Sequence, residues 1–188
     1  MKRKEIEFEG IITDKDIEKG NLILLVGRPA VGKTEVCSKI VKKYGNEYGY
    51  LFFDLRGNED SYWLKNIKRV IEYHTAVEII KTIQKEVKNN LKFVFIDYWQ
   101  LIDDKDDWFR YMLVELALSN KIVITITSQL SRVVENRKNH LPLNKDLKSI
   151  FNDIFLSSGK VVVISKPAIY GIDLKKDLHY FLYKDLDT

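Results

Sequence analysis

Residues 27–34 read Gly-Arg-Pro-Ala-Val-Gly-Lys-Thr, which fits the pattern G-x-x-x-x-G-K-[ST]. An apolar run, Leu22–Val26, precedes this stretch and is typical of a strand, and from Lys33 onward the pattern favours a helix. Glycines between a strand and a helix let backbone N–H groups turn toward phosphate oxygens, and the N-terminus of the helix adds a positive partial charge. Because this context surrounds the motif, the stretch predicts a phosphate-binding loop and not a chance match in an ordinary loop.

The fixed positions of this loop have separate expected roles. We expect Lys33 to reach the β and γ oxygens of a nucleoside triphosphate and the Thr34 hydroxyl to ligate Mg²⁺. The residues expected to line the nucleotide site are Gly27, Arg28, Pro29, Ala30, Val31, Gly32, Lys33, Thr34 and Glu35.

The composition indicates one globular domain. The chain has 188 residues, and no Pro-, Gly- or Ser-rich stretch marks a boundary, so we expect a single domain over residues 1–188. No apolar run approaches the roughly 18–20 residues that cross a bilayer. The first residues, Met1-Lys2-Arg3-Lys4, lead into Glu5 and Glu7 and not into the apolar core of a signal peptide. We therefore expect a cytoplasmic protein without a membrane partner.

Charge, cysteine and histidine content say little about function. The net charge of +4 arises from 31 basic and 27 acidic residues, so it points only weakly to nucleic acid. The single cysteine, Cys37, is expected to be a small buried side chain. His74, His140 and His179 lack the spacing of metal ligands, and we assign them no role.

Five short apolar runs alternate with helical patterns. The runs are Leu22–Val26, Tyr50–Leu55, Phe93–Ile96, Ile122–Ile126 and Val161–Ile164. They are continuous and rich in β-branched and aromatic residues, which is typical of strands buried on both faces. Helices are expected over Glu35–Tyr44, Ala76–Asn89 and Trp108–Leu118. This alternation predicts an α/β fold with a mostly parallel, twisted sheet and helices on both faces.

Two finer expectations concern element ends. Thr75 is the expected N-cap of the helix over Ala76–Asn89, and Glu78 would complete a capping box. The stretch Leu178–Tyr183 is expected to add a strand, antiparallel at the edge of the sheet.

Two polar segments are expected beside the phosphate loop. Asp97 ends the run Phe93–Ile96, and because parallel strands end at one rim of a sheet, we expect it to hold Mg²⁺ through water. Gln129 follows Ile122–Ile126 and is expected at the same rim, where it would sense the γ-phosphate or orient the attacking water. A turn carboxylate and an ordinary loop amide are the alternatives.

These segments together resemble the C-terminal, RecA-like ATPase domain of DnaB-type replicative helicases. The loop over residues 27–34 resembles that family's phosphate loop, and Phe95-Ile-Asp-Tyr-Trp-Gln-Leu-Ile102 resembles its Walker B segment. The stretch Ser128-Gln-Leu-Ser-Arg132 falls on the family's Ser-Gln-Leu-Asn-Arg motif. The resemblance implies a RecA-like P-loop fold, ATP and Mg²⁺ as cofactors, and Lys33, Asp97 and Gln129 as the catalytic residues.

The loop after Gln129 carries the implied contacts with nucleic acid. In the family this loop faces a central channel and touches single-stranded DNA. The basic residues that would contact the DNA backbone are Arg132, Arg137, Lys138, Lys145 and Lys148. A solvated loop is the alternative. Tyr98, Trp99 and Trp108 could stack on bases, although packing in a core or an interface is the more common fate of aromatic side chains.

Three departures from the family pattern bear on catalysis and assembly. Arg56 stands where the family has a glutamate that polarises the attacking water, so either Asp54, Glu59 or Asp60 supplies a base or hydrolysis is slow. Near the end, Lys166 matches the family's Lys-x-Arg motif, but Ala168 stands in place of the arginine finger. The family's N-terminal domain and linker helix, which help to build the hexamer, have no counterpart in this sequence.

Three functions are open at this point. An ATPase linked to single-stranded DNA in replication or recombination, assembled as a homo-oligomer, accounts for all the motifs. A hydrolysis-poor regulatory or scaffold subunit, docked on a replication or recombination protein, accounts for Arg56 and Ala168. A small-molecule kinase would need a lid of arginines that the sequence does not show.

Overall fold

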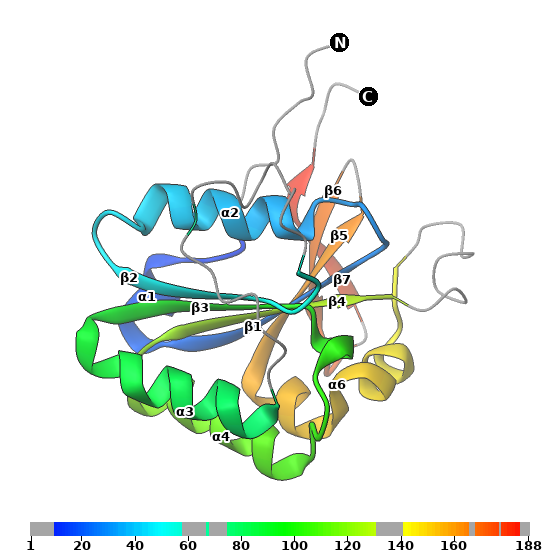
Figure 1. Ribbon diagram of the computed structural model, residues 1–188. Helices are drawn as coiled ribbons and strands as arrows, with labels where there is room; N and C mark the ends of the chain where they lie inside the picture. The colour runs from blue at the N-terminus through cyan, green and yellow to red at the C-terminus, as the bar shows by residue number, and fades with distance from the viewer. Residues whose placement is uncertain are drawn as a thin grey trace.

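The computed structural model describes residues 10–57, 67, 75–130, 141–165, 168–176 and 178–184. Within these residues, one seven-stranded sheet lies between helices (Figure 1). Its strands are β1 (Asn21–Gly27), β2 (Gly49–Asp54), β3 (Leu91–Asp97), β4 (Val123–Gln129), β5 (Gly159–Ser165), β6 (Ala168–Asp173) and β7 (Leu178–Lys184). The helices are α1 (Asp14–Lys19), α2 (Lys33–Tyr44), α3 (Ala76–Glu86), α4 (Asp107–Ser119) and α6 (Asn144–Ser158), with short 3₁₀ turns η2 (Val87–Asn89) and η3 (Trp99–Leu101).

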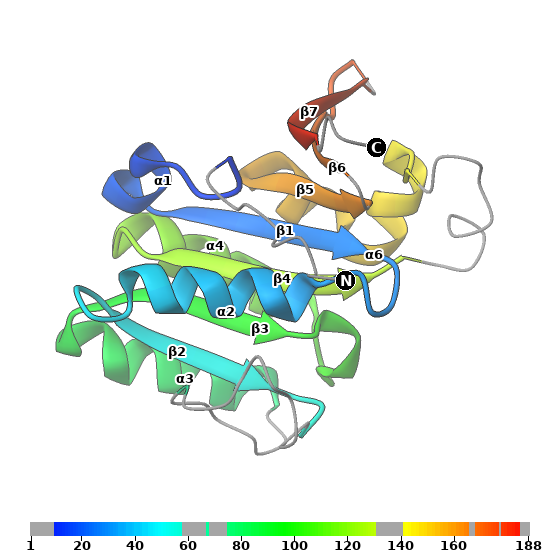
Figure 2. The ribbon, with the colours of Figure 1, turned by 90° about the horizontal axis from the view of Figure 1, so that it is seen from above.

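The sheet is mostly parallel. Its strand order is β2-β3-β4-β1-β5-β6-β7, and the first five of these strands are parallel to their neighbours. β6 and β7 extend the sheet as antiparallel strands beyond β5. The parallel strands therefore end at one rim, which Figure 2 shows as the end toward which their arrowheads point. The segments that follow β1, β2, β3 and β4 all leave from this rim, which we call the carboxyl rim.

Helices cover both faces of the sheet, as Figure 1 shows with α2 on one face and α3, α4 and α6 on the other. The central strand β1 explains why both faces are covered. Leu22 and Leu24 pack in the hydrophobic cluster under α3, α4 and α6, whereas Ile23 and Leu25 pack in the cluster under α2. Because every second side chain of a strand points to the same face, a continuous apolar run buries both sides. The predicted α/β architecture is confirmed.

Most of the predicted elements are present. The five apolar runs form β1 to β5, and the stretch from Leu178 forms the antiparallel edge strand β7. The capping box of α3 is also confirmed. The Glu78 backbone N–H donates to Thr75 Oγ1 (3.3 Å), and the Thr75 backbone N–H donates to Glu78 Oε2 (3.0 Å).

The predicted loop around Lys145 and Lys148 is wrong. The resemblance implied that both residues lie in a loop after Gln129, whereas the structure places them on α6. The helix buries Leu147, Phe151 and Phe155, and its helical path is interrupted at Asn152 (φ 58°, ψ 178°). Leu147 and Phe151 lie four residues apart before this break, a spacing that favours a helix and not the loop implied by the resemblance.

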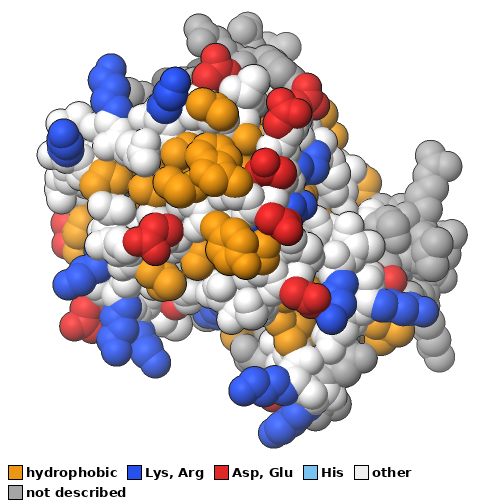
Figure 3. Space-filling model, turned by 90° about the horizontal axis from the view of Figure 1, so that it is seen from below, with side chains coloured by type: hydrophobic (Ala, Val, Ile, Leu, Met, Phe, Trp, Pro, Cys, Tyr) orange, Lys and Arg blue, Asp and Glu red, His pale blue; other side chains and the backbone are white. Residues whose placement is uncertain are grey.

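Trp99 and Trp108, which the sequence suggested could stack on bases, have different environments. Trp99 is 1% exposed, stacks on Phe109 with ring centroids 5.9 Å apart, and donates from Nε1 to the Ile150 carbonyl oxygen (3.1 Å). Trp99 therefore packs in the core. Trp108 and Tyr111 lie on α4 and are 47% and 61% exposed. Hydrophobic side chains gather on the face of the molecule seen from below, on the side of the sheet that α3, α4 and α6 cover (Figure 3).

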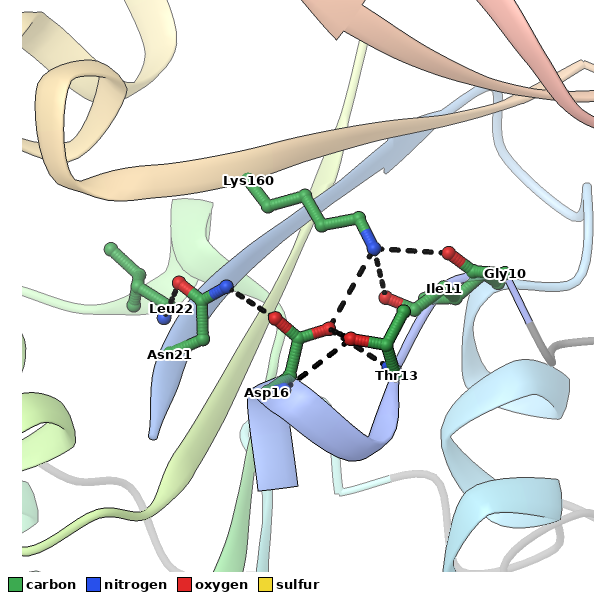
Figure 4. A network of polar contacts seen from close by, with 7 residues as sticks. All are labelled: Gly10, Ile11, Thr13, Asp16, Asn21, Leu22 and Lys160. Carbon is green, nitrogen blue, oxygen red and sulfur yellow. Dashed lines mark hydrogen bonds and ion pairs between the residues drawn. The ribbon is translucent and has the colours of Figure 1, made fainter. Parts of the chain in front are cut away.

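A partly buried polar network anchors α1 at the end of the sheet opposite the carboxyl rim (Figure 4). The Asp16 carboxylate accepts hydrogen bonds from Thr13 N and Oγ1 (both 2.8 Å) and from Asn21 Nδ2 (2.7 Å). Lys160 Nζ lies 3.7 Å from Asp16 Oδ2 and donates to two backbone carbonyl oxygens, at 3.0 Å each. Burial raises the pKa of Asp16, but these hydrogen bonds and the charge of Lys160 outweigh it, so the pKa lies below its usual value. The network stabilises the fold with Asp16 ionised.

Asp16→Asn is expected to lower the free energy of unfolding at pH 7 by about 1–3 kcal/mol, because it weakens charge-assisted hydrogen bonds and leaves Lys160 without its carboxylate. The pKa of Asp16 is lower in the folded than in the unfolded chain. Its contribution is therefore complete above the unfolded pKa and is lost as the pH falls through the folded pKa. Urea unfolding at pH 7 and pH 3 measures the effect, and the difference from wild type should narrow at pH 3. An equal difference at both pH values would contradict the assignment. Glu18→Gln, an exposed acid on the same helix, is the control.

Candidate nucleotide-binding site

The loop between β1 and α2 needs glycine at its two fixed glycine positions. Gly32 has φ 105°, in the left-handed region that side chains rarely adopt. At Gly27, a Cβ atom would lie 2.7 Å from the Ile164 carbonyl oxygen and 2.8 Å from Val31 Cγ1, so a side chain there would clash. The first glycine lets the loop pass close to β5, and the second lets the chain turn into α2. The local structure thus explains both glycines of the motif.

Lys33 lies across this loop. Its Nζ donates to the Gly27 carbonyl oxygen (3.0 Å) and to the Arg28 carbonyl oxygen (2.7 Å), and the residue is only 8% exposed. A buried ammonium group requires such partners. The loop therefore holds a fixed positive charge beside the N-terminus of α2, which together form a favourable site for an anion.

Asp97 forms the centre of a polar cluster next to the loop. Thr34 Oγ1, from the first turn of α2, donates to Asp97 Oδ2 (2.7 Å). Thr127 Oγ1, from β4, donates to Asp97 Oδ1 (2.5 Å). Asp97 is the last residue of β3 and is 1% exposed. Three elements of the fold thus bring a hydroxyl or a carboxylate to one point of the carboxyl rim, and Asp97 and Thr34 lie together as predicted.

Arg56 joins this cluster from the segment after β2. Its Nη2 forms an ion pair and a hydrogen bond with Asp97 Oδ2 and also donates to Thr34 Oγ1 (2.7 Å). The Arg56 guanidinium also lies over the Tyr98 ring, with its carbon atom Cζ 5.6 Å from the ring centroid. Arg56 is the departure from the family pattern noted above, and its contact with Asp97 was not predicted.

The donor atoms at this point fit Mg²⁺. Thr34 and Asp97 offer a hydroxyl and a carboxylate oxygen, and Mg²⁺ in such sites typically uses one or two carboxylates together with substrate phosphates and water. Within the described ranges, no group of three or more His, Cys, Asp or Glu side chains could hold a metal ion by itself. The guanidinium of Arg56, however, lies against the same two oxygens. A metal ion and Arg56 would therefore be alternatives at these atoms.

Gln129 is placed beside the phosphate loop by the register of the sheet. It ends β4 opposite Gly27 of β1, and the Leu130 backbone N–H donates to the Gly27 carbonyl oxygen (3.2 Å). Gln100, on η3, donates from Nε2 to Ser128 Oγ (2.7 Å) and to the Gln129 carbonyl oxygen (3.0 Å). Gln100 thus joins the ends of β3 and β4 at the rim.

Two residues of the site were not predicted to have a role. Gln100 is the one polar side chain in the segment Trp99–Ile102 that follows β3, and this isolated amide was the available signal. Thr127 lies two residues before Gln129, where a hydroxyl near the end of a buried strand indicates a polar neighbour at the rim. Thr127 bonds to the Asp97 carboxylate, and Gln100 bonds to the Gln129 carbonyl oxygen, so both help to position residues that the motifs identify.

One of the expected replacement bases lies beside the site. Asp54 is the last residue of β2, pairs in register with Asp97, and is fully buried. Glu59 and Asp60 lie outside the described residues.

The basic residues expected to contact DNA are only partly described. Arg132, Arg137 and Lys138 lie outside the described residues. Lys145 is exposed on α6, and Lys148 on the same helix forms an ion pair with Asp153 (2.8 Å).

Of the other residues singled out in the sequence, those that the structure describes lie outside the polar cluster. Ala168 begins β6 and is 4% exposed, whereas Lys166 lies outside the described residues. Cys37 is buried, and this burial raises the pKa of its thiol. His179 Nε2 lies 2.9 Å from the Pro142 carbonyl oxygen. His74 and His140 lie outside the described residues.

Among the described helices, none is both long and apolar enough to cross a membrane.

Comparisons with known proteins identify the fold and the family. The family model of the DnaB-like helicase C terminal domain matches residues 58–179. A probable replicative DNA helicase of Trieres chinensis is 26% identical over 185 residues, in an alignment that covers 70% of this chain and 40% of that protein. The chain thus spans less than half the length of this curated relative.

Solved structures agree with this match. One of them, an isolated ATPase domain, superposes with a TM-score of 0.67 at 17% identity, covering 96% of this chain and 88% of that one. A DnaB-like replicative helicase, from a study of its interactions with primase, superposes with a TM-score of 0.64 at 18% identity, covering 92% of this chain and 57% of that one. The predicted RecA-like fold is therefore confirmed, and the chain belongs to the family of DnaB-like helicase C-terminal domains.

Proposed function

We propose that this chain binds ATP at residues 27–34 and acts as a helicase-like ATPase linked to single-stranded DNA. The observation that carries this proposal is the arrangement at the carboxyl rim, where Lys33 bonds to the loop over residues 27–34 and the adjacent Thr34 bonds to Asp97 at the end of β3. Ligands of open α/β sheets bind at this rim. Membership of the DnaB-like family supports the helicase-like role.

In the proposed complex, the phosphates lie against the N–H groups at the start of α2. Lys33 then exchanges its contacts with the loop carbonyl oxygens for contacts with phosphate oxygens. Thr34 and Asp97 are the residues that would hold Mg²⁺ once Arg56 leaves them, and the metal would then supply charge neutralisation at the phosphates. Gln129, whose backbone lies opposite Gly27, is the proposed sensor of the γ-phosphate.

The proposed contacts with DNA come from the segment that follows Gln129. Arg132, Arg137 and Lys138 lie in that segment, and Lys145 and Lys148 lie on the first turns of α6. Because β4 ends at the carboxyl rim and β5 starts at the opposite end of the sheet, the helix between them begins near the rim. Basic side chains at this end could bind the DNA backbone beside the nucleotide.

The proposed assembly follows the family and its relatives. We propose that residues 1–188 act as one domain in the cytoplasm and associate with further copies in a ring. One solved relative is described with primase, which makes a replication protein a reasonable partner for this chain. A recombination protein is the other partner class we propose.

A second function is favoured by one contact. Because Arg56 bonds to Asp97 and to Thr34, the position of the family glutamate holds a cation and offers no base. Together with Ala168 at the expected arginine-finger position, this favours a hydrolysis-poor regulatory or scaffold subunit that still binds nucleotide.

Steady-state ATP turnover with and without single-stranded DNA separates these two functions. For the ATPase, DNA should raise turnover by about tenfold or more, equivalent to about 1.4 kcal/mol of barrier, and Lys33→Ala should abolish it. ATP binding without turnover, with or without DNA, would instead support the regulatory subunit. Failure to bind ATP would contradict both.

A further inference from the structure

The guanidinium of Arg56 lies at the two atoms that would ligate a divalent cation. Its Nη2 contacts Asp97 Oδ2 and donates to Thr34 Oγ1 at 2.7 Å. In a phosphate-loop protein, the Thr hydroxyl and the strand-terminal Asp are the protein's contribution to Mg²⁺. Here a positive charge from the chain itself is bonded to both groups.

Arg56 is held in this place from three directions. Asp97 and Thr34 bond to its Nη2, and the Tyr98 ring lies under the guanidinium at 5.6 Å. Its side chain is 31% exposed, whereas that of Asp97 is 2% exposed, so the ion pair is sheltered on the side of the carboxylate. Thr127 donates to the other oxygen of Asp97. The carboxylate is thus fully engaged with hydroxyl groups and Arg56.

The chemistry of a guanidinium suits the role of a counter-charge for phosphate. It stays protonated at neutral pH, and it carries five N–H donors on three nitrogens, so one arginine can bond to a carboxylate and to a phosphate together. A metal ion and a guanidinium repel each other, so direct binding of Mg²⁺ at the two oxygens that Arg56 contacts is disfavoured while Arg56 stays in place. Mg²⁺ would therefore have to displace Arg56 before it could use Thr34 and Asp97.

We propose that Arg56 is a nucleotide-binding residue that replaces Mg²⁺ as the counter-charge of the phosphates. This inference rests on the proposed nucleotide site and adds to it that ATP binding depends little on Mg²⁺. Lys33 and Arg56 approach the loop from α2 and from the segment after β2, so the phosphates would lie between two fixed cations. The opposite possibility is that Arg56 swings away and Mg²⁺ binds with ATP.

The test is the affinity for a fluorescent ATP analogue in excess Mg²⁺ and in excess EDTA. The wild type should change its Kd by less than about threefold between the two media, whereas Arg56→Gln should bind at least about tenfold more weakly in EDTA than in Mg²⁺. Arg56→Lys keeps a positive charge but lacks the several N–H donors of the guanidinium. Its change in Kd between the two media should lie between those of the wild type and Arg56→Gln. Thermal unfolding checks that each variant is folded.

The outcomes of this experiment are distinct. If the wild type binds tightly in Mg²⁺ and its Kd weakens in EDTA as much as that of Arg56→Gln, the role of Arg56 is overturned. The proposed nucleotide site would then remain intact. Absence of binding in both media would overturn the nucleotide site and this inference together.

Discussion

Lys33→Ala is expected to weaken ATP binding by about 100-fold or more, equivalent to about 2.7 kcal/mol of binding free energy. Lys33 Nζ lies within the loop, bonded to the carbonyl oxygens of Gly27 and Arg28, and brings the one charge that the motif directs at the phosphates. Alanine removes this charge and leaves the N–H groups of the loop in place. Isothermal titration of ATP into the wild type and the variant measures the loss.

The matched control is Lys42→Ala. Lys42 lies on the same helix and carries the same charge but is exposed in the last turn of α2, so its removal should change the Kd by less than about twofold. If Lys33→Ala bound ATP within about threefold of wild type, the nucleotide would not lie in the loop over residues 27–34, and the proposed site would be wrong.

Arg56→Glu is expected to raise the rate of ATP turnover by about 10²- to 10⁴-fold, the usual contribution of a positioned general base. Position 56 follows β2 at the carboxyl rim, and its side chain reaches Asp97 and Thr34. By resemblance to DnaB-type helicases, this is the position of the glutamate that polarises the attacking water. Glutamate would supply the base, and it would also free Asp97 from the guanidinium. Release of inorganic phosphate in the presence of single-stranded DNA measures the gain.

Arg56→Gln separates the two effects of this substitution. Glutamine removes the guanidinium and frees Asp97 without adding a base, so its rate should stay at least about tenfold below that of the glutamate variant. Equal rates for the glutamate and glutamine variants would show that position 56 does not hold the missing base. Asp54, buried at the end of β2 beside Asp97, would then be the next residue to substitute.

The parallel strands could be predicted because a strand buried on both faces requires a continuous run of apolar residues. β1 and β3 are buried on both faces, so their sequences are continuous apolar runs with no alternation to misread. β6 was not predicted, because Ala168–Asp173 contains a glycine and ends in an acid. This strand lies in the antiparallel part of the sheet, between β5 and β7. Such a strand depends on its neighbours more than on its own composition.

Helices were missed for two different reasons. α1 is short and polar, and its signal was the capping box of Thr13 and Asp16, which the structure shows in full. In α6, the buried residues Leu147 and Phe151 lie four residues apart before a break at Asn152, but the resemblance to a DNA-binding loop took precedence over this helical spacing. The second error was avoidable from the sequence.

The residues of the candidate site that belong to a sequence motif could be predicted. The contacts that depend on which strands are neighbours in the sheet could not. Lys33 and Thr34 follow from the phosphate loop, and Asp97 follows from its place at the end of an apolar run. The pair of Arg56 and Asp97 depends on β2 lying beside β3, with Asp54 in register with Asp97. A set of parallel strands allows many orders, so the sequence could not bring these two side chains together. The roles of the basic residues after Gln129 stay predictions.

A crystal structure of this protein with a non-hydrolysable ATP analogue tests the proposed nucleotide site most directly. We expect the triphosphate to lie along Gly27–Thr34, with Lys33 Nζ within hydrogen-bonding distance of its β or γ oxygens and Asp97 beside them. An analogue bound elsewhere on the molecule, or a loop that stays closed by the contacts of Lys33 with Gly27 and Arg28 at saturating analogue, would contradict this expectation.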